Sequence, residues 1–146
     1  MTDFRRLSDT VWASPQITLE EVAQARADGF TAIINNRPDG EEAGQPTSDE
    51  IAAAAQEQGL GYRYIPVTGG GMTPDKIAET VAALEEADGP TLAYCRSGTR
   101  STFLWALAEA SRGAQPQDLV TAAAAAGYDI SAIAPALEGL SSKARP

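Results

Sequence analysis

Short apolar runs alternate with longer amphipathic stretches along most of the chain. Runs typical of buried strands occupy residues 10–13, 30–35, 62–67 and 91–94. Apolar residues at helical spacing predict helices over residues 18–28, 47–59, 73–87, from 100 onward, 116–126 and 132–140. Because parallel strands need crossover connections, this alternation predicts an α/β fold with a mostly parallel central sheet of about four or five strands flanked by helices.

Capping residues support these boundaries. The pattern Thr-x-x-Glu at residues 18–21 and 47–50 is typical of a capping box, and Thr73 followed by Pro74 is typical of a helix start. The last residues, 141–146, are expected to be frayed.

Three loops are predicted to meet at one edge of the sheet. Sheets of this kind bind ligands at the carboxyl ends of their strands. The loops at those ends span residues 36–42, 68–72 and 95–101. We expect them to converge around Cys95, the one cysteine of the chain.

Cys95 lies between a predicted strand and a predicted helix, a position that favours a nucleophile. Free backbone N–H groups and the positive end of the helix dipole stabilise a thiolate and bind anions. The N–H groups of residues 96–100 could cradle an oxyanion, with Gly98 permitting the turn and Arg100 adding a bidentate guanidinium. The Ser101 hydroxyl could donate to the thiolate. The alternative is that Cys95 is merely a small buried hydrophobic residue.

Composition narrows the possible functions. The 146 residues, 43% hydrophobic and 21% charged, predict a single globular domain over residues 1–146. The formal net charge of −9 argues against nucleic acid or an anionic membrane as a partner, because both bind clustered Lys and Arg. Arg96 and Arg100 belong to only 11 basic residues and flank one potential anion pocket, so a small anionic substrate is expected.

Missing residue types exclude further chemistry. Without histidine, the chain has no Cys-His or Ser-His pair and no histidine-ligated metal. A single cysteine allows neither an internal disulfide nor a thiolate-rich metal cluster, so we expect no metal and no cofactor. No secretory signal or membrane-spanning stretch is recognisable, which predicts a cytoplasmic protein.

Other polar residues have two interpretations. Asp39 could be a general acid or the first residue of an Asp-Gly turn, whereas Asp75 suits the first turn of a helix. The glycine run at 69–71, which includes Gly70, could form a lid over the pocket or a bare loop. Further acidic residues are expected on a solvated surface: Glu41, Glu42, Asp49 and Glu50.

Two motifs taken together resemble a known family. The motifs are Cys-Arg-Ser-Gly-Thr-Arg-Ser at 95–101, followed by Leu-Trp-Ala-Leu-Ala at 104–108, and Ile-Asn-Asn-Arg-Pro-Asp-Gly-Glu at 34–41. They resemble the bacterial beta-lactamase-hydrolase-like family, which has a fold like that of tyrosine and dual-specificity phosphatases. The resemblance covers roughly residues 4–112 and leaves the predicted helices of about 116–140 outside it. It implies a cysteine-phosphatase-like fold; members are described both as phosphatases and as sulfur transferases.

The resemblance also implies residue roles. Cys95 would be the nucleophile, Arg100 the oxyanion arginine and Ser101 the hydroxyl residue that follows it. The backbone cradle would comprise Arg96, Ser97, Gly98 and Thr99. A segment beside the pocket would contain Asn35, Asn36, Arg37 and Asp39. A metal-dependent partner enzyme of sulfur metabolism is compatible with the resemblance.

The chain departs from tyrosine phosphatases in three respects. Four residues separate Cys95 from Arg100 where those enzymes have five, and the shorter loop resembles that of rhodanese-type sulfurtransferases. Tyr94 stands where a histidine often precedes the cysteine, and the loop after Val67 carries no carboxylate.

These departures favour sulfur chemistry over phosphoryl chemistry. The leading hypothesis is a sulfurtransferase in which Cys95 accepts a sulfane sulfur as a persulfide, a step that needs little acid assistance. The alternative is a phosphatase that forms a phosphocysteine intermediate from a phosphate ester. The third possibility is an anion-binding module that keeps the cradle but has no turnover.

Overall fold

The central element of the fold is one five-stranded sheet with strand order β1-β2-β5-β3-β4. A computed structural model describes residues 2–68 and 71–144. The strands are β1 Arg5–Arg6, β2 Val11–Ser14, β3 Ala32–Asn35, β4 Gly61–Tyr64 and β5 Thr91–Tyr94. Neighbouring strands are parallel except for β1 and β2, which are antiparallel. The predicted α/β fold with a mostly parallel sheet is confirmed.

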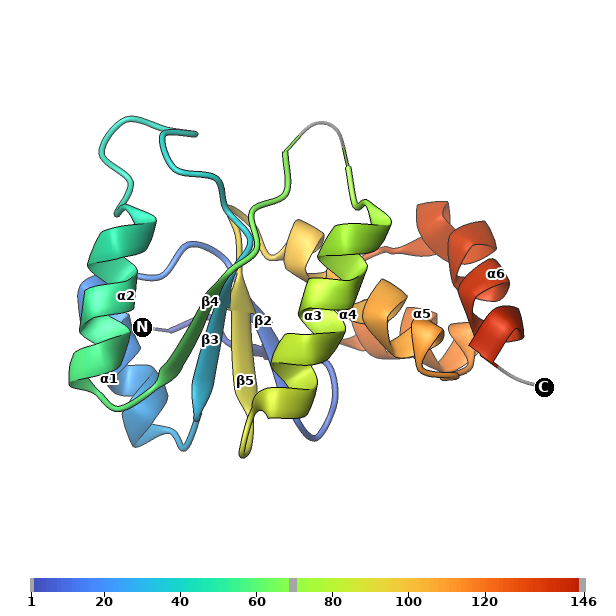
Figure 1. The fold of residues 1–146 in the computed structure, drawn as a ribbon, viewed down its shortest axis with the longest axis horizontal. Helices are drawn as coiled ribbons and strands as arrows, with labels where there is room; N and C mark the ends of the chain where they lie inside the picture. The colour runs from blue at the N-terminus through green and yellow to red at the C-terminus, as the bar shows by residue number, and fades with distance from the viewer. Residues whose placement is uncertain (1, 69–70, 145–146) are drawn as a thin grey trace.

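Helices cover both faces of the sheet, as Figure 1 shows. Their bounds are α1 Leu19–Ala27, α2 Ser48–Glu57, α3 Pro74–Glu86, α4 Thr99–Ser111, α5 Pro116–Ala125, the 3-10 helix η1 Ser131–Ile133 and α6 Ala134–Ala144. Helices α1 and α2 lie on one face and α3 and α4 on the other, while α5 and α6 pack against the far side of α4 (Figure 1). The last two helices therefore extend the molecule beyond the layer that covers the sheet.

Successive residues of the central strands fill the two cores in turn. In β3, Ile33 packs with residues of α1 and α2, whereas the next residue, Ile34, packs with residues of α3 and α4. In β5, Leu92 and Ala93 divide between the same two cores. Burying a side chain the size of isoleucine contributes about 2 kcal/mol, so both faces of β3 and β5 stabilise the centre of the sheet.

The four parallel strands end level with one another. Tyr94 of β5 pairs with Ser14 of β2 on one side and with Asn35 of β3 on the other, and Asn35 pairs in turn with Tyr64 of β4. The loops that follow these strands therefore begin side by side at one edge of the sheet. This register brings residues far apart in sequence to a common site.

Several elements differ from the sequence-based expectations. The strand expected over residues 62–67 is β4, which ends at Tyr64. Strand β1 has only two residues, Arg5 and Arg6, and is defined by pairing with β2, so it leaves no periodic signal in the sequence. Helix α6 continues through Ala144, so the frayed tail expected from residue 141 onward is wrong for residues 141–144. Ser141 is 3% exposed, and its burial explains why this turn stays helical.

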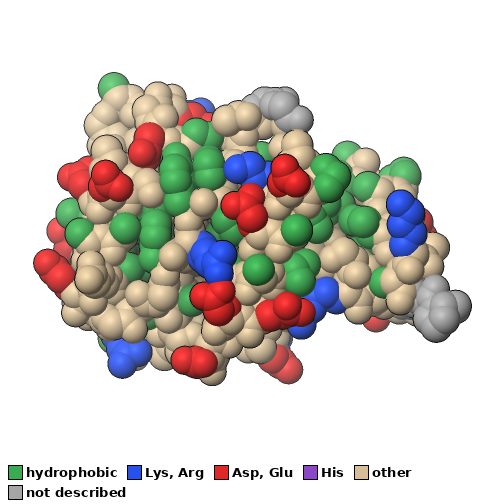
Figure 2. Space-filling model, viewed as in Figure 1, with side chains coloured by type: hydrophobic (Ala, Val, Ile, Leu, Met, Phe, Trp, Pro, Cys, Tyr) green, Lys and Arg blue, Asp and Glu red, His purple; other side chains and the backbone are tan. Residues whose placement is uncertain are grey.

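Charged side chains are mixed over the visible surface. On the face shown in Figure 2, Lys and Arg side chains are dispersed, with Asp and Glu beside several of them. Within residues 2–68 and 71–144, no helix is both long enough and apolar enough to cross a membrane.

Candidate active site

Cys95 is buried directly after β5, with none of its surface exposed. Its backbone N–H donates to the carbonyl of Ser14 at 3.3 Å, which extends the β2–β5 pairing by one residue. Its Sγ accepts the backbone N–H of Gly98 at 3.1 Å. Helix α4 begins immediately beyond this contact, with the positive end of its dipole toward the loop.

Position 98 of the loop requires a glycine. Its φ of +96° is left-handed, and a Cβ built there would overlap the hydroxyl of Tyr128. That hydroxyl donates to the carbonyl of Ser97 at 3.0 Å. The hydroxyl of Thr102, in α4, donates to the Gly98 carbonyl at 2.8 Å. The loop is thus held from both α4 and the segment after α5.

Two N–H groups of the cysteine loop are available to an anion. Among the residues the structure describes, no acceptor lies within hydrogen-bond distance of the N–H groups of Arg96 and Ser97. The carbonyl of Arg96 points the other way and accepts the N–H of Gln16 at 3.3 Å. Unpaired N–H groups beside a helix N-terminus are the usual donors to a bound oxyanion. Within the cradle predicted for residues 96–100, the N–H of Gly98 is instead bonded to the Cys95 sulfur and that of Thr99 to the Ser97 hydroxyl.

Arg100 reaches from the first turn of α4 to the two neighbouring loops. Its Nη1 donates to the carbonyl of Val67 at 2.9 Å. Its Nη1 and Nη2 donate to the two carboxylate oxygens of Glu41, each at 2.8 Å, in a fork-to-fork ion pair. The pair with Glu41 raises the pKa of Arg100, and the charge of Cys95 acts in the same direction. Arg100 therefore joins the three loops predicted to converge.

Glu41 is exposed, as the sequence predicts, but it also has partners that the sequence does not indicate. Its carboxylate binds Arg100 and also accepts from Nε of Arg37 at 2.9 Å. Hydrogen bonds from Arg100, and then from Arg37, lower its pKa from 4.5 to about 2. The signal available in the sequence was indirect: two arginines in the loop of an acidic protein require nearby counter-charges.

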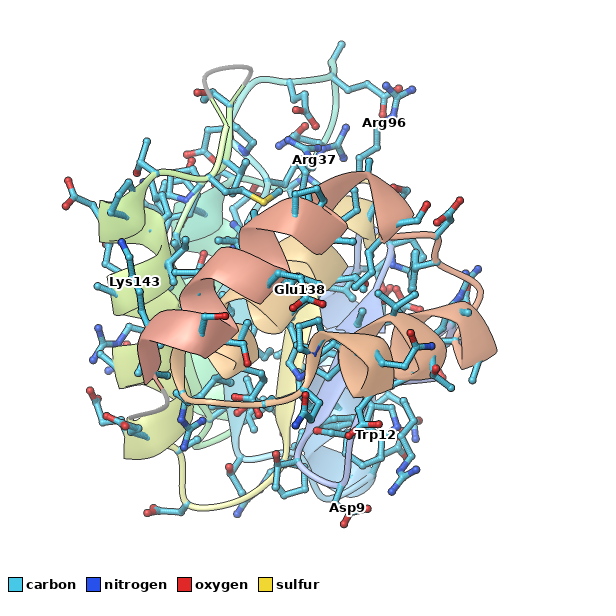
Figure 3. The ribbon with its side chains drawn as sticks, turned by 90° about the vertical axis from the view of Figure 1, so that its right-hand side faces the viewer. Asp9, Trp12, Arg37, Arg96, Glu138 and Lys143 are labelled. Carbon is cyan, nitrogen blue, oxygen red and sulfur yellow. The ribbon has the colours of Figure 1, made fainter. Side chains whose placement is uncertain are left out.

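Arg37 is a buried cation behind the site, with its side chain only 2% exposed. Besides Glu41, it contacts Gln16 through Nη1 at 3.0 Å and Glu42 through Nη2 at 3.5 Å. Glu42 lies 3.9 Å from Arg96, so the two acidic residues link Arg37 to both arginines of the cysteine loop. Figure 3 shows Arg37 and Arg96 at the same end of the molecule, opposite Asp9.

Ser101 and Asn36 form a buried polar pair. The Ser101 hydroxyl donates to Oδ1 of Asn36 at 2.8 Å, and Nδ2 of Asn36 donates to the carbonyl of Ile65 at 2.8 Å. A hydroxyl has one proton, so the expected donation from Ser101 to the Cys95 thiolate is replaced by this bond. Asn36 thereby ties α4 to the ends of β3 and β4.

Asp39 lies at the start of α2. Its Oδ1 accepts the backbone N–H of Ser48 at 2.7 Å, and its own N–H donates to the hydroxyl of Tyr64 at 2.9 Å. A carboxylate at a helix N-terminus satisfies a free N–H and interacts favourably with the dipole. Nearby, Asn35 accepts the Arg37 N–H through Oδ1 at 2.8 Å and so shapes the turn that presents Arg37.

Two further residues singled out in the sequence are Gly70 and Tyr94. Gly70 lies outside the described residues. Tyr94, in the place of a histidine, is 1% exposed and packs in the core between the sheet and α1 and α2. Burial is the main cause that raises the pKa of its phenol, so Tyr94 is neutral.

The arrangement was compared with known proteins. A family model described as beta-lactamase hydrolase-like protein, phosphatase-like domain, matches residues 3–112. The chain belongs to this family. A beta-lactamase hydrolase-like protein of Agrobacterium fabrum is 36% identical over 128 residues, which are 87% of this chain and 30% of that protein. The chain thus spans less than a third of the length of this relative.

Solved structures agree with this family assignment. A candidate phosphatase from Neisseria meningitidis Z2491 superposes with a TM-score of 0.81 at 32% identity, covering 96% of this chain and 99% of that one. PTPMT1, solved in complex with PI(5)P, has a TM-score of 0.75 at 14% identity, covering 97% and 99% of the two chains. The second similarity shows a shared fold alone.

The family assignment favours a phosphatase over a sulfurtransferase. The family description and that of the meningococcal structure both name a phosphatase, and neither names sulfur transfer. The preference for a sulfurtransferase, which rested on loop length and the missing acid, is therefore not supported. Cys95, the free N–H groups of Arg96 and Ser97, and Arg100 lie together on one loop of this phosphatase-like fold.

Proposed function

We propose that this domain hydrolyses phosphate monoesters through a phosphocysteine on Cys95. The observation that carries the proposal is that the Cys95 sulfur accepts the Gly98 N–H within a loop that leaves two further N–H groups free for an oxyanion. Arg100, at the start of α4, adds a fixed guanidinium to the same loop. The family's phosphatase-like description and the full-length similarity to a candidate phosphatase support this choice.

The chemistry proceeds in two displacements. The Cys95 thiolate attacks phosphorus, an S–P bond forms, and the P–O ester bond breaks with its electron pair leaving on the alcohol oxygen. Water then attacks phosphorus, the S–P bond breaks, and inorganic phosphate and the thiolate are released. The loop N–H groups and Arg100 bind the equatorial phosphoryl oxygens, on which negative charge is held through both steps.

The decisive experiment uses p-nitrophenyl phosphate with the unmodified chain and with Cys95→Ser. We expect turnover by the parent, a loss of at least about a thousandfold in Cys95→Ser, and a phosphorylated parent in rapid-quench mass spectrometry. Phosphate binding without turnover or a covalent adduct would instead identify an anion-binding module and end the enzymatic proposal.

The second candidate function is sulfur transfer, favoured by the four-residue spacing between Cys95 and Arg100. In that reaction the thiolate attacks the outer sulfur of thiosulfate, and sulfite leaves with the electron pair of the broken S–S bond. Intact mass after incubation with thiosulfate distinguishes the two reactions. A gain of one sulfur atom by the parent, absent from Cys95→Ser, supports sulfur transfer, and no gain removes it.

A further inference from the structure

The guanidinium of Arg100 offers two edges to an oxyanion, and one is already occupied. Its Nη1–Nη2 edge binds both oxygens of Glu41, and Nη1 also binds the carbonyl of Val67. In the described part of the chain, the Nε–H donates to no oxygen atom, and the guanidinium lies within hydrogen-bonding reach of the Cys95 side chain. The Nε–Nη2 edge therefore remains for a ligand, and an arginine can bind an oxyanion in two-point fashion through that edge.

Arg100 lies close enough to Cys95 for their charges to interact. The negative charge of the Cys95 sulfur helps to raise the pKa of Arg100, after the larger contribution of Glu41. The guanidinium thus binds Glu41 and Val67 through its Nη1–Nη2 edge, here called the outer edge, and also interacts with Cys95. The Nε–Nη2 edge is the inner edge. Rotation that would turn the outer edge toward the site would break three hydrogen bonds.

Glu41 is also bound by a second arginine, Arg37. Its Oε1 accepts from Nε of Arg37, and the Arg37 side chain, 2% exposed, is fixed by Gln16 at 3.0 Å. Glu41 thus lies between a buried cation and the cation of the site. Because three N–H donors hold this carboxylate, displacing it would break more hydrogen bonds than displacing a glutamate with a single partner.

We propose that Glu41 is a positioning residue, which holds the outer edge of Arg100 so that the inner edge binds the oxyanion at Cys95. The inference rests on the proposed function for the identity of that oxyanion, a phosphoryl group. The opposite role is a competitor that occupies Arg100 until substrate displaces it. The two roles predict opposite changes in anion affinity when the carboxylate is removed.

Titration calorimetry with inorganic phosphate distinguishes the positioning role of Glu41 from the competitor role. For Glu41→Gln we expect phosphate binding to weaken by roughly tenfold, because Arg100 loses its charged partner and its fixed orientation. The matched control is Glu42→Gln, which removes the same charge one residue away, from a carboxylate paired with Arg37 and Arg96. We expect that control to stay within about twofold of the parent or to bind phosphate more tightly.

A second variant tests whether Glu41 acts through Arg100. Lysine has no second edge, so in an Arg100→Lys background the further change Glu41→Gln should leave phosphate affinity unchanged within about twofold. The Glu41 side chain is 29% exposed, and far-UV circular dichroism checks that its variant folds.

The outcomes distinguish this inference from the proposed function. Unchanged or tighter phosphate binding by Glu41→Gln overturns the positioning role, as does a parent chain that binds no phosphate. A parent that binds phosphate, shows the expected pattern of variants and turns over no phosphate ester supports the positioning role while refuting the enzymatic proposal.

Discussion

The hydroxyl of Ser101 donates to Oδ1 of Asn36 at 2.8 Å, across 65 residues of sequence, and both side chains are buried. This bond joins the first turn of α4 to the end of β3. It fixes the helix that carries Arg100 relative to the strand edge from which the other loops leave.

Replacing Ser101 with alanine should therefore reduce stability. The change leaves the buried Oδ1 of Asn36 without a donor, which costs about 1–3 kcal/mol. A control on the same helix is Ser111→Ala, because that hydroxyl donates to the nearby carbonyl of Ala108, and its loss should change stability by about 0.5 kcal/mol or less. Urea unfolding compares the two variants, and equal costs would contradict a structural role for the buried pair.

Gly98→Ala should disrupt the cysteine loop. The new Cβ overlaps the Tyr128 hydroxyl and must also adopt a φ of +96°, so we expect a loss of about 2 kcal/mol or more together with loss of phosphate binding. Gly29→Ala is the matched control, because its φ is +99° and nothing lies within 4 Å of the added Cβ. It should show only the backbone cost of about 1 kcal/mol and retain binding. If both variants lose the same stability, crowding by Tyr128 is unimportant.

The leaving group should control the rate of the proposed hydrolysis. The segment from Thr68 to Met72 carries no carboxylate that could protonate an alkoxide. Because general acid catalysis typically contributes 10²–10⁴-fold, we expect p-nitrophenyl phosphate to be hydrolysed at least about a hundredfold faster than a simple alkyl phosphate. Rates for a series of phenyl phosphates measure this dependence. Equal rates for aryl and alkyl esters would point to an acid elsewhere in the site.

Asp39→Asn separates the two interpretations of that carboxylate. If its role is at the start of α2, the variant loses about 0.3–1 kcal/mol of stability while aryl phosphate turnover stays within about twofold. If Asp39 is the general acid, hydrolysis of alkyl phosphate falls and its pH profile loses the limb that depends on a protonated acid. Unfolding and pH–rate measurements on one variant therefore decide the matter.

Stability should depend on the Glu41 carboxylate at low pH. Its folded pKa of about 2 lies below the ordinary 4.5, chiefly because of the hydrogen bonds from Arg100. The contribution is therefore fully present above the ordinary value and is lost as the pH falls through the folded value. Since the pair is partly exposed, we expect about 1 kcal/mol. Urea unfolding of Glu41→Gln should show a correspondingly weaker pH dependence in this range, whereas Glu42→Gln should follow the parent.

The sequence predicts the parts of this fold that local patterns determine. Apolar runs identify β2 to β5, and Thr18 and Thr47 form the capping boxes expected at the starts of α1 and α2. The cysteine loop is also recognisable, because a cysteine, a glycine and an arginine at fixed spacing follow a buried strand. These features depend on residues that are neighbours in the chain.

The parts that could not be predicted depend on tertiary contacts. The ion pair of Glu41 and Arg100 joins residues 59 positions apart and depends on how an irregular loop folds back over the site. The partner of Ser101 is even more distant, at 65 positions, so the hydroxyl could be assigned to the thiolate only by proximity along the chain. No local periodicity encodes either contact.

Tyr128 lies outside residues 3–112, the segment that matches the family, yet its hydroxyl binds the Ser97 carbonyl in the cysteine loop. The segment that matches the family is therefore smaller than the unit that shapes the cysteine loop. If this domain was exchanged between genes during evolution, a breakpoint after residue 112 would have separated the loop from its support.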